Sequence, residues 1–347
     1  MNNYKKLGVT ALAGTLASLT AMQAANAGAI DVSGSVDLSY VGADSDETAG
    51  NQYGMGHGFT FGSSGELDNG YSWSYFVAYA DGTIGLSSIT SAAVAINLDT
   101  MGSLTVSQGS GSAVSLIDDI TPSAYEESWD GVNQGLNLVG SVNSGTVLRY
   151  TSPALPLGTT LVVGYNPDVG AGKAADGSTA VGTNLQGSGQ DVSLTTSLGI
   201  DGLTLGAGYG EVEVQAPKTN SSTYKSDIDE YIGYVKYAVG GVTVGYFQSY
   251  ESTGERAAAS PDAYETDGFG ISFQVNDNFA IGYAQVDNTK NFGTVGTADV
   301  SMETDGISMS YNLGGASLLI QHNEQNRSWG SATASDENTE IRLKMAF

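Results

Sequence analysis

Cysteine is absent from the 347-residue sequence, and basic side chains are scarce. Without disulfide bonds, an exported protein of this composition must be stabilised by packing or by hydrogen-bonded closure. The 12 Lys and Arg residues stand against 37 Asp and Glu, which gives a formal net charge of −25 at pH 7. That charge would repel a polyanion, so nucleic acid is excluded as a partner, whereas cations are favoured.

Long apolar runs are also absent, apart from one near the N-terminus. Lys5 and Lys6 precede an apolar stretch that reaches Met22, and the small-x-small cleavage pattern Ala-Asn-Ala follows at residues 25–27. Thr, Ser and Gly dilute this stretch, and it is shorter than the roughly 20 strongly apolar residues of a membrane-anchor helix. We therefore predict a removed signal peptide at residues 1–27 and an exported chain at residues 28–347.

The dominant pattern in the remaining sequence is alternation with period 2. Ile30, Val32 and Val36 share one parity of the first segment, and the residues between them are Asp, Ser and Gly. Similar segments recur along the chain between Gly, Asn, Asp and Pro residues, which indicates β-strands. The strands predicted from this pattern number sixteen and span residues 29–41, 53–64, 71–80, 90–98, 103–109, 146–152, 159–166, 191–200, 203–212, 229–239, 242–250, 264–275, 279–287, 300–313, 316–323 and 337–347.

The connections between these strands alternate in length. Very short turns are followed by long polar links rich in Gly, Asp and Ser, and an even strand count with this alternation is typical of a bacterial outer-membrane barrel. In hydrocarbon every backbone N–H and C=O must be paired internally, so a β-protein can span a membrane only as a closed barrel. We predict an all-β fold, a 16-stranded antiparallel transmembrane β-barrel. The alternative is a soluble secreted sandwich or solenoid, whose strands alternate in the same way.

Two further features suggest a family. Residues 144–158 read SGTVLRYTSPALPLG, and the chain ends on Phe347. With the signal peptide and the sixteen segments, they make the chain resemble the trimeric general porins of Gram-negative outer membranes. Arg149 and Tyr150 fit that family's Val-x-Arg-Tyr-x-Ser-Pro strand, which leaves the third loop. The resemblance implies a homotrimer in the outer membrane, and it makes Phe347 part of the signal that barrel assembly machinery recognises.

The sequence departs from the family pattern at two places. Leu155 stands where many members have an aromatic residue, and the Pro-Glu-Phe-Gly-Gly tract of some third loops is absent. A third difference concerns charge, because no Lys or Arg occurs between residues 7 and 148. The first five strands therefore add no basic wall, whereas many relatives have an arginine cluster there.

The longest predicted connection spans residues 109–145, and the resemblance implies that this third link folds into the barrel and narrows the pore. A link of that length is usually functional or disordered. Leu116, Ile117 and Trp129 give it apolar material for packing. The alternative is a solvated acidic loop. The residues predicted to form an acidic pore constriction are Asp118, Asp119, Glu126, Glu127 and Asp130.

Basic residues are predicted on the opposite wall of the pore. Arg149, Lys236, Arg342 and Lys344 alternate with apolar neighbours in their strands, so we predict that each points into the lumen. The alternative for any one of them is a charge at the membrane interface, whose long side chain extends to water. Acids outnumber these cations, which should raise the local cation concentration and disfavour anions. We therefore predict a cation-selective pore.

Histidine occurs only at His57 and His322, and both fall on the apolar parity of predicted strands. A barrel lipase or protease needs a histidine beside Ser or Asp, so we predict no enzymatic activity and no catalytic residue. No cofactor or metal site is predicted. Acidic loop residues such as Asp44, Asp46 and Glu47 offer carboxylates for Ca²⁺, in a pattern that is not specific for it.

These features together predict a water-filled outer-membrane channel for passive diffusion of ions and small hydrophilic solutes. Its expected partners are those solutes, cations, outer-membrane lipid and further copies of the chain. One alternative is a substrate-selective channel with a solute-binding step. Another is an adhesin or a structural barrel.

The assignment of the last strand, EIRLKMAF, can be tested by removing its predicted lumenal charges. Replacing Arg342 and Lys344 with Gln should make the pore more cation-selective, because two positive charges leave the water path. The measurement is the reversal potential of the double variant in a salt gradient. A reversal potential equal to that of the unmodified protein would show that this face does not line the lumen.

Overall fold

The computed structural model describes residues 29–43, 51–81, 89–132, 136–170, 186–214, 226–255, 260–293, 297–326, 329 and 335–347. The predicted signal peptide and the acidic residues Asp44, Asp46 and Glu47 lie outside these ranges. Within them, no helix is long and apolar enough to cross a membrane.

Strands form nearly all of the regular structure. Three short 3₁₀ helices occur among the described residues, η2 (Asp99–Met101), η3 (Ser141–Asn143) and η4 (Pro156–Gly158). The strands are β1 (Asp31–Ala43), β2 (Tyr53–Glu66), β3 (Ser72–Asp81), β4 (Ile89–Asn97), β5 (Ser103–Gln108), β6 (Thr146–Thr151), β7 (Thr160–Asn166), β8 (Gln186–Thr196), β9 (Leu203–Val214), β10 (Ile228–Val239), β11 (Val242–Ser252), β12 (Ala263–Asn276), β13 (Phe279–Asn291), β14 (Val300–Asn312), β15 (Ser317–Asn326) and β16 (Asp336–Ala346).

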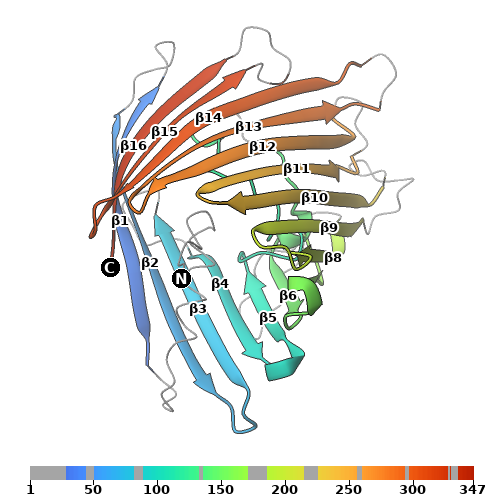
Figure 1. The fold of residues 1–347 in the computed structure, drawn as a ribbon. Helices are drawn as coiled ribbons and strands as arrows, with labels where there is room; N and C mark the ends of the chain where they lie inside the picture. The colour runs from blue at the N-terminus through green and yellow to red at the C-terminus, as the bar shows by residue number, and fades with distance from the viewer. Residues whose placement is uncertain are drawn as a thin grey trace.

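The sixteen strands close into one barrel in which each strand pairs antiparallel with its neighbours in sequence (Figure 1). β1 pairs with β16 from Ser35 opposite Ala346 to Ala43 opposite Asn338, and this pairing closes the sheet. Turns at one rim are short, as at residues 240–241 and 277–278, whereas the links at the other rim are longer, as at residues 109–145. The predicted all-β, 16-stranded antiparallel barrel is confirmed.

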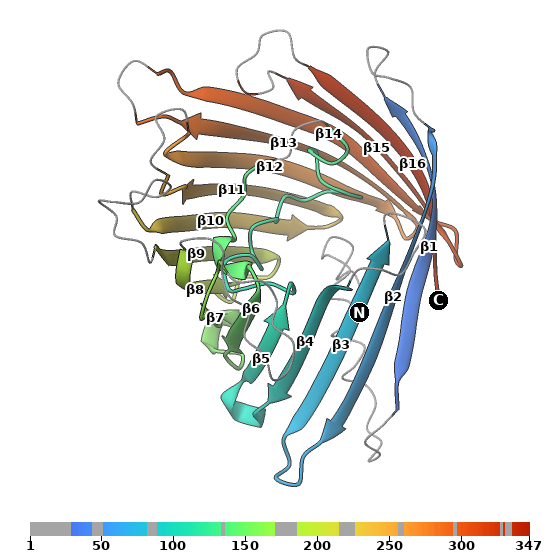
Figure 2. The same cartoon turned by 180° about the vertical axis from the view of Figure 1, so that it is seen from behind.

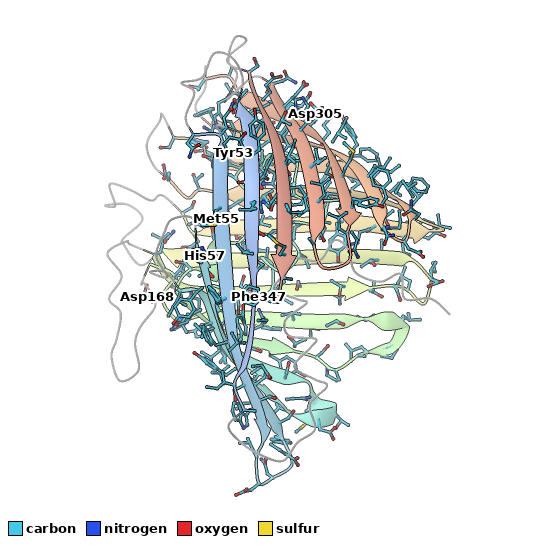
Figure 3. All side chains as sticks on the ribbon, turned by 90° about the vertical axis from the view of Figure 1, so that its left-hand side faces the viewer. Tyr53, Met55, His57, Asp168, Asp305 and Phe347 are labelled. Atoms are coloured by element: carbon cyan, nitrogen blue, oxygen red, sulfur yellow. The ribbon has the colours of Figure 1, made fainter. Side chains whose placement is uncertain are left out.

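Side chains alternate between the two faces of the wall. On β12 the apolar residues Phe269, Ile271 and Phe273 are 45%, 37% and 41% exposed, while Gly268 and Gly270, on the opposite parity, are buried. Figure 3 shows Tyr53, Met55 and His57 along β2, with Phe347 beside the same strand. The exposed apolar face points outward, as expected of a barrel whose outer surface is solvated by lipid.

The chain terminus lies at the seam of the barrel. The Gly34 N–H donates to the Phe347 carbonyl oxygen over 2.8 Å, and the Phe347 N–H donates to the Gly34 carbonyl oxygen over 2.9 Å. Its ring lies 5.8 Å from the ring of Phe59, and a Cβ on Gly34 would come within 2.9 Å of the Phe347 ring. The terminal aromatic residue therefore extends the seam beyond β16.

The strand whose bounds differ most from the prediction is β8. The segment predicted at 191–200 is β8, which begins at Gln186 and ends at Thr196. Its first residues, Gln-Gly-Ser-Gly, carry no apolar alternation, so pairing with β9 rather than side-chain pattern specifies them. Leu198 and Ile200 lie in an exposed turn, 47% and 51% accessible, and Leu198 has a positive φ of 49°.

The described part of the link between β5 and β6, residues 109–132 and 136–145, runs along the inner side of the wall. In Figure 2 the described part of this link passes in front of β10 to β13, whereas in the opposite view of Figure 1 those strands cover it. Val114, Ile117 and Val139 of the link form a buried cluster with apolar side chains of β10, β11 and β13. The cluster joins the link to the barrel by hydrophobic contact.

Glycines on the inner face of the wall make room for the link. A Cβ on Gly270 of β12 would lie 2.7 Å from the Pro122 carbonyl oxygen, and one on Gly282 of β13 would lie 2.7 Å from the Ala124 nitrogen. Both neighbours are backbone atoms, so neither can yield by a rotamer change. A Cβ on Gly208 or Gly245 would meet side-chain atoms of the link, and one on Gly306 would lie 3.1 Å from the Ser128 Cα.

Gly270→Val should therefore destabilise the barrel, because its side chain would displace the link or strain the wall. Overpacking of this kind lowers the free energy of unfolding by about 1–3 kcal/mol. Gly233→Val on β10 is the matched control, since a Cβ there meets no atom within 4 Å. Thermal unfolding in detergent, followed by circular dichroism, should show a lower midpoint for Gly270→Val alone. Equal midpoints in the two variants would contradict this account of the glycines.

Candidate functional site

The wall holds the link through side chains that accept hydrogen bonds from its backbone. The Val114 N–H donates to Asp191 Oδ2 on β8 over 2.7 Å. The N–H groups of Gly140 and Ser141 both donate to Glu230 Oε2 on β10, over 2.6 and 2.9 Å. Asp191 and Glu230 are 3% and 0% exposed. These two buried acids therefore fix the start and the end of the link.

The middle of the link is held by β14 and β15. Asn323 donates through Nδ2 to the carbonyl oxygens of Glu127 and Asp130, over 3.0 and 2.8 Å. The Ala124 N–H donates to Ser308 Oγ over 2.9 Å. Since β8, β10, β14 and β15 all contact the link, it crosses the interior from one side of the barrel to the other.

Sequence reasoning assigned no role to Asp191, Glu230 or Asn323. The sequence does place these three residues on the inward parity of their strands. Parity alone, however, predicts only that an inward side chain faces the water of the pore, and not that it binds the link. The available signal was apolar: Ile228 and Ile232 flank Glu230 on the same face of β10 and are buried. Apolar residues on the inner parity indicate that chain, rather than water, covers that part of the wall.

Three predicted acids of the link, Asp118, Asp119 and Glu127, lie close together, and Asp119 lies near Lys236 of β10. Burial raises the pKa of Asp118 to about 7 and that of Glu127 to about 9. Burial also raises the pKa of Asp119, whose carboxyl group shares a hydrogen bond with that of Glu127. Lys236 lies close enough to Asp119 to favour its charged form. This arrangement places a group of carboxyls with elevated pKa values on the inner side of the barrel wall.

A second group joins the link to β16. Arg342 donates through Nη1 to Glu126 Oε1 over 3.0 Å, and through Nη2 to Glu340 Oε1 over 2.9 Å. Tyr125 donates its hydroxyl to Glu340 Oε2 over 3.1 Å, and its ring centroid lies 5.4 Å from the Arg342 guanidinium. Burial raises the pKa of Glu126 to about 8, with the nearby Asp130 carboxyl adding to the rise. The structure thus brings Glu126 directly onto Arg342 rather than across a gap from it.

The other predicted wall cations occupy different surroundings. Arg149 lies on the inner face of β6 but is 9% exposed, and it donates through Nη1 to the carbonyl oxygens of Ser110 and Gly111. It therefore lies beneath the start of the link rather than in open lumen. Lys344 lies opposite Asp37 of β1 in the register of the closing seam.

Metal-ligating groups come together at one place among the described residues. His322, Glu324 and Glu337 each bring a ligand atom within 4.8 Å of the other two. All three have the outward parity of β15 and β16, so this group is separate from the acids of the link. His57, the other histidine, lies on the outward face of β2 (Figure 3).

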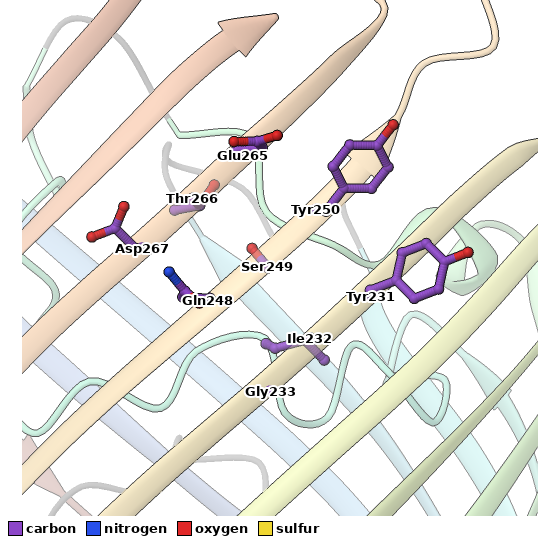
Figure 4. Close-up of a pocket in the computed structure, with 9 residues that line it drawn as sticks. All are labelled: Tyr231, Ile232, Gly233, Gln248, Ser249, Tyr250, Glu265, Thr266 and Asp267. Atoms are coloured by element: carbon purple, nitrogen blue, oxygen red, sulfur yellow. The ribbon is translucent and has the colours of Figure 1, made fainter.

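The outer wall also carries a shallow hollow of about 310 Å³ over β10, β11 and β12 (Figure 4). Tyr231 and Tyr250 lie at one end, and Gln248, Glu265 and Asp267 line the rest. These side chains have outward parity, so the hollow belongs to the outer surface and not to the interior of the barrel.

Comparison with known proteins gives the family. Residues 8–328 match the family model described as Gram-negative porin. No curated protein sequence matches the chain.

Solved structures share the fold. Salmonella typhi OmpF in complex with daunomycin is 11% identical with a TM-score of 0.65, covering 92% of this chain and 97% of that chain. Outer-membrane-expressed OmpT of Vibrio cholerae is 14% identical with a TM-score of 0.62, over 94% and 100% of the two chains. A porin refined at 1.8 Å is 16% identical with a TM-score of 0.62, over 92% and 100%.

The family match covers most of the chain, and the porin structures have the same closed barrel. The resemblance predicted from the sequence is therefore confirmed at the level of the family. The chain belongs to the Gram-negative porin family and is a β-barrel channel protein of the outer membrane.

Proposed function

We propose that this porin passes ions and small hydrophilic solutes by passive diffusion through a water-filled pore that favours cations. The observation that carries the proposal is the link of residues 109–145, which crosses the inner side of the wall and brings its acids together there. Asp118, Asp119, Glu126, Glu127 and Asp130 form the proposed constriction. Carboxylates beside a narrow water path raise the local concentration of cations.

The cations of the wall do not balance these acids. Arg342 is bound by Glu126 and Glu340, and one ionised carboxylate is enough to neutralise it. Arg149 lies beneath the link, so its charge is screened from the path. Lys236 and Lys344 remain of the predicted wall cations, and once the link carboxyls ionise above their raised pKa values, the acids of the proposed constriction outnumber these two lysines.

The proposal includes no enzymatic activity, cofactor or catalytic residue. Both histidines have outward parity, whereas the acids of the link lie on the inner side of the wall. Neither histidine can therefore act together with the acids of the link.

We further propose a homotrimer that is recognised by barrel assembly machinery through Phe347. Phe59, Phe61 and Phe347 give the seam of the barrel an aromatic outer surface, on which neighbouring subunits could pack. Migration of the unheated protein on a detergent gel at three times the mass of the heated chain supports the trimer, and migration as a monomer contradicts it.

Planar-bilayer recording tests the channel directly. Purified protein should give unit conductance steps, and a potassium chloride gradient should give a reversal potential of the sign expected for potassium over chloride. A potential favouring chloride would overturn the cation preference. Saturable block by one solute would identify a substrate-selective channel instead, and the absence of unit steps would indicate an adhesin or structural barrel.

Selectivity should also depend on pH in the neutral to alkaline range. Because the pKa values of Asp118, Glu126 and Glu127 are raised to about 7, 8 and 9, these groups are protonated at pH 6 and ionised at pH 10. A unit charge about 10 Å from the path changes an ion's energy by about 0.4 kcal/mol in water, or about twofold in local concentration. The permeability ratio of potassium to chloride should therefore rise between these pH values, most strongly at low salt.

The double variant Glu126→Gln with Glu127→Gln should flatten this rise, since it removes two of the titrating groups. Glu324→Gln, on the outer face of β15, is the matched control and should leave the pH dependence intact. A permeability ratio that is constant from pH 6 to pH 10 in the unmodified protein would show that the link carboxyls titrate at ordinary values or lie away from the path.

A further inference from the structure

Three potential metal ligands meet on the outward face of β15 and β16, away from the proposed pore. His322 and Glu324 share a face of β15, two residues apart, and Glu337 lies directly opposite Glu324 on β16. One ligand atom from each lies within 4.8 Å of the other two. A tetrahedral Zn²⁺ with bonds of about 2.0–2.1 Å brings its ligand atoms to about 3.3–3.5 Å of one another. Small rotations of the exposed Glu side chains are enough to reach that geometry.

The imidazole ring of His322 is oriented by a hydrogen bond at the nitrogen that faces away from the two Glu carboxylates. Its Nδ1 lies 2.7 Å from Thr339 Oγ1, and Thr339 is its direct partner in the register of β16. Metal-binding histidines usually make such a bond through the nitrogen that does not bind the metal, because it fixes the ring and its tautomer. The other ring nitrogen, Nε2, lies on the side of the acids, 3.3 Å from Glu324 Oε1.

The acids of this face repel one another. Glu324 lies opposite Glu337 on one side and opposite Asp305 on the other. Like charges directly opposite across a sheet are destabilising. The lysines and arginines that the structure describes all have inward parity in their strands, so none of them shares this face. A divalent cation between the two Glu carboxylates would relieve the repulsion.

We propose that His322, Glu324 and Glu337 bind one divalent transition-metal cation, with Zn²⁺ as the best match. One imidazole nitrogen and two carboxylate oxygens are a ligand set that suits Zn²⁺, whereas Ca²⁺ and Mg²⁺ prefer oxygen ligands alone. Three protein ligands leave a fourth position for water or for an outside group. The site is independent of the channel function, since its residues lie on the outer surface of the wall.

Isothermal titration of the full-length detergent-solubilised barrel with zinc chloride tests the proposal. We expect one Zn²⁺ per chain, with affinity lowered at least about tenfold in both His322→Gln and Glu337→Gln. Excess calcium should leave zinc binding unchanged. His57→Gln is the matched control, because it removes the chain's other histidine from the outer face of a different strand.

Thr339→Val gives a second readout that keeps all three ligands. Loss of the hydrogen bond to Nδ1 should weaken zinc binding by about tenfold without abolishing it. Heat-modifiable gel migration confirms that each variant is folded. Absence of one-to-one zinc binding in the unmodified protein, or an affinity that His322→Gln leaves unchanged, would overturn the site in favour of a hydrogen bond between His322 and Glu324 alone.

Discussion

The pairing of β1 with β16 is the interaction on which the rest of the structure depends. A sheet that spans hydrocarbon has no water with which to satisfy an open edge, so a single unpaired strand would leave a row of backbone groups without partners. Closure removes that edge, and the two hydrogen bonds between Phe347 and Gly34 continue it to the last residue. In a chain without cysteine, this closed hydrogen-bond network takes the place of covalent cross-links.

Closure also determines what the interior must contain. A barrel of sixteen strands is too wide for its own side chains to fill, so water or additional chain occupies the space. Here a substantial part is occupied by the link of residues 109–145, and the inner face is built to hold it. Glycines such as Gly270 and Gly282 give it room, apolar residues of β10, β11 and β13 pack against it, and the buried acids Asp191 and Glu230 accept its backbone N–H groups. Many side chains of the inner wall therefore contact the link rather than the water of the pore.

The outer face could be predicted from the sequence more completely than the inner one. Lipid favours apolar residues at the outward positions of most strands, so alternation predicted sixteen strands. The alternating lengths of the connections and the even strand count then predicted closure. The start of β8 was missed because Gly187 and Gly189 carry no side chain to alternate, and pairing with β9 specifies it instead. On the inner face the contacts are long-range: Arg149 has the predicted parity but lies beneath Ser110 and Gly111, and Arg342 meets Glu126 from 216 residues away. The sequence pattern predicts on which face of the wall such residues lie, but it does not predict which residues they contact.

The central claim is that the acidic link lies in the water path of the pore. Because the chain has no cysteine, a single Glu126→Cys substitution gives a unique reactive thiol on a side chain that is 28% exposed in the unmodified protein. The direct measurement is the unit conductance of that variant in a planar bilayer before and after addition of a bulky, membrane-impermeant thiol reagent. The account predicts a stepwise fall in conductance for each modified channel. Complete modification of the thiol with unchanged conductance would contradict it.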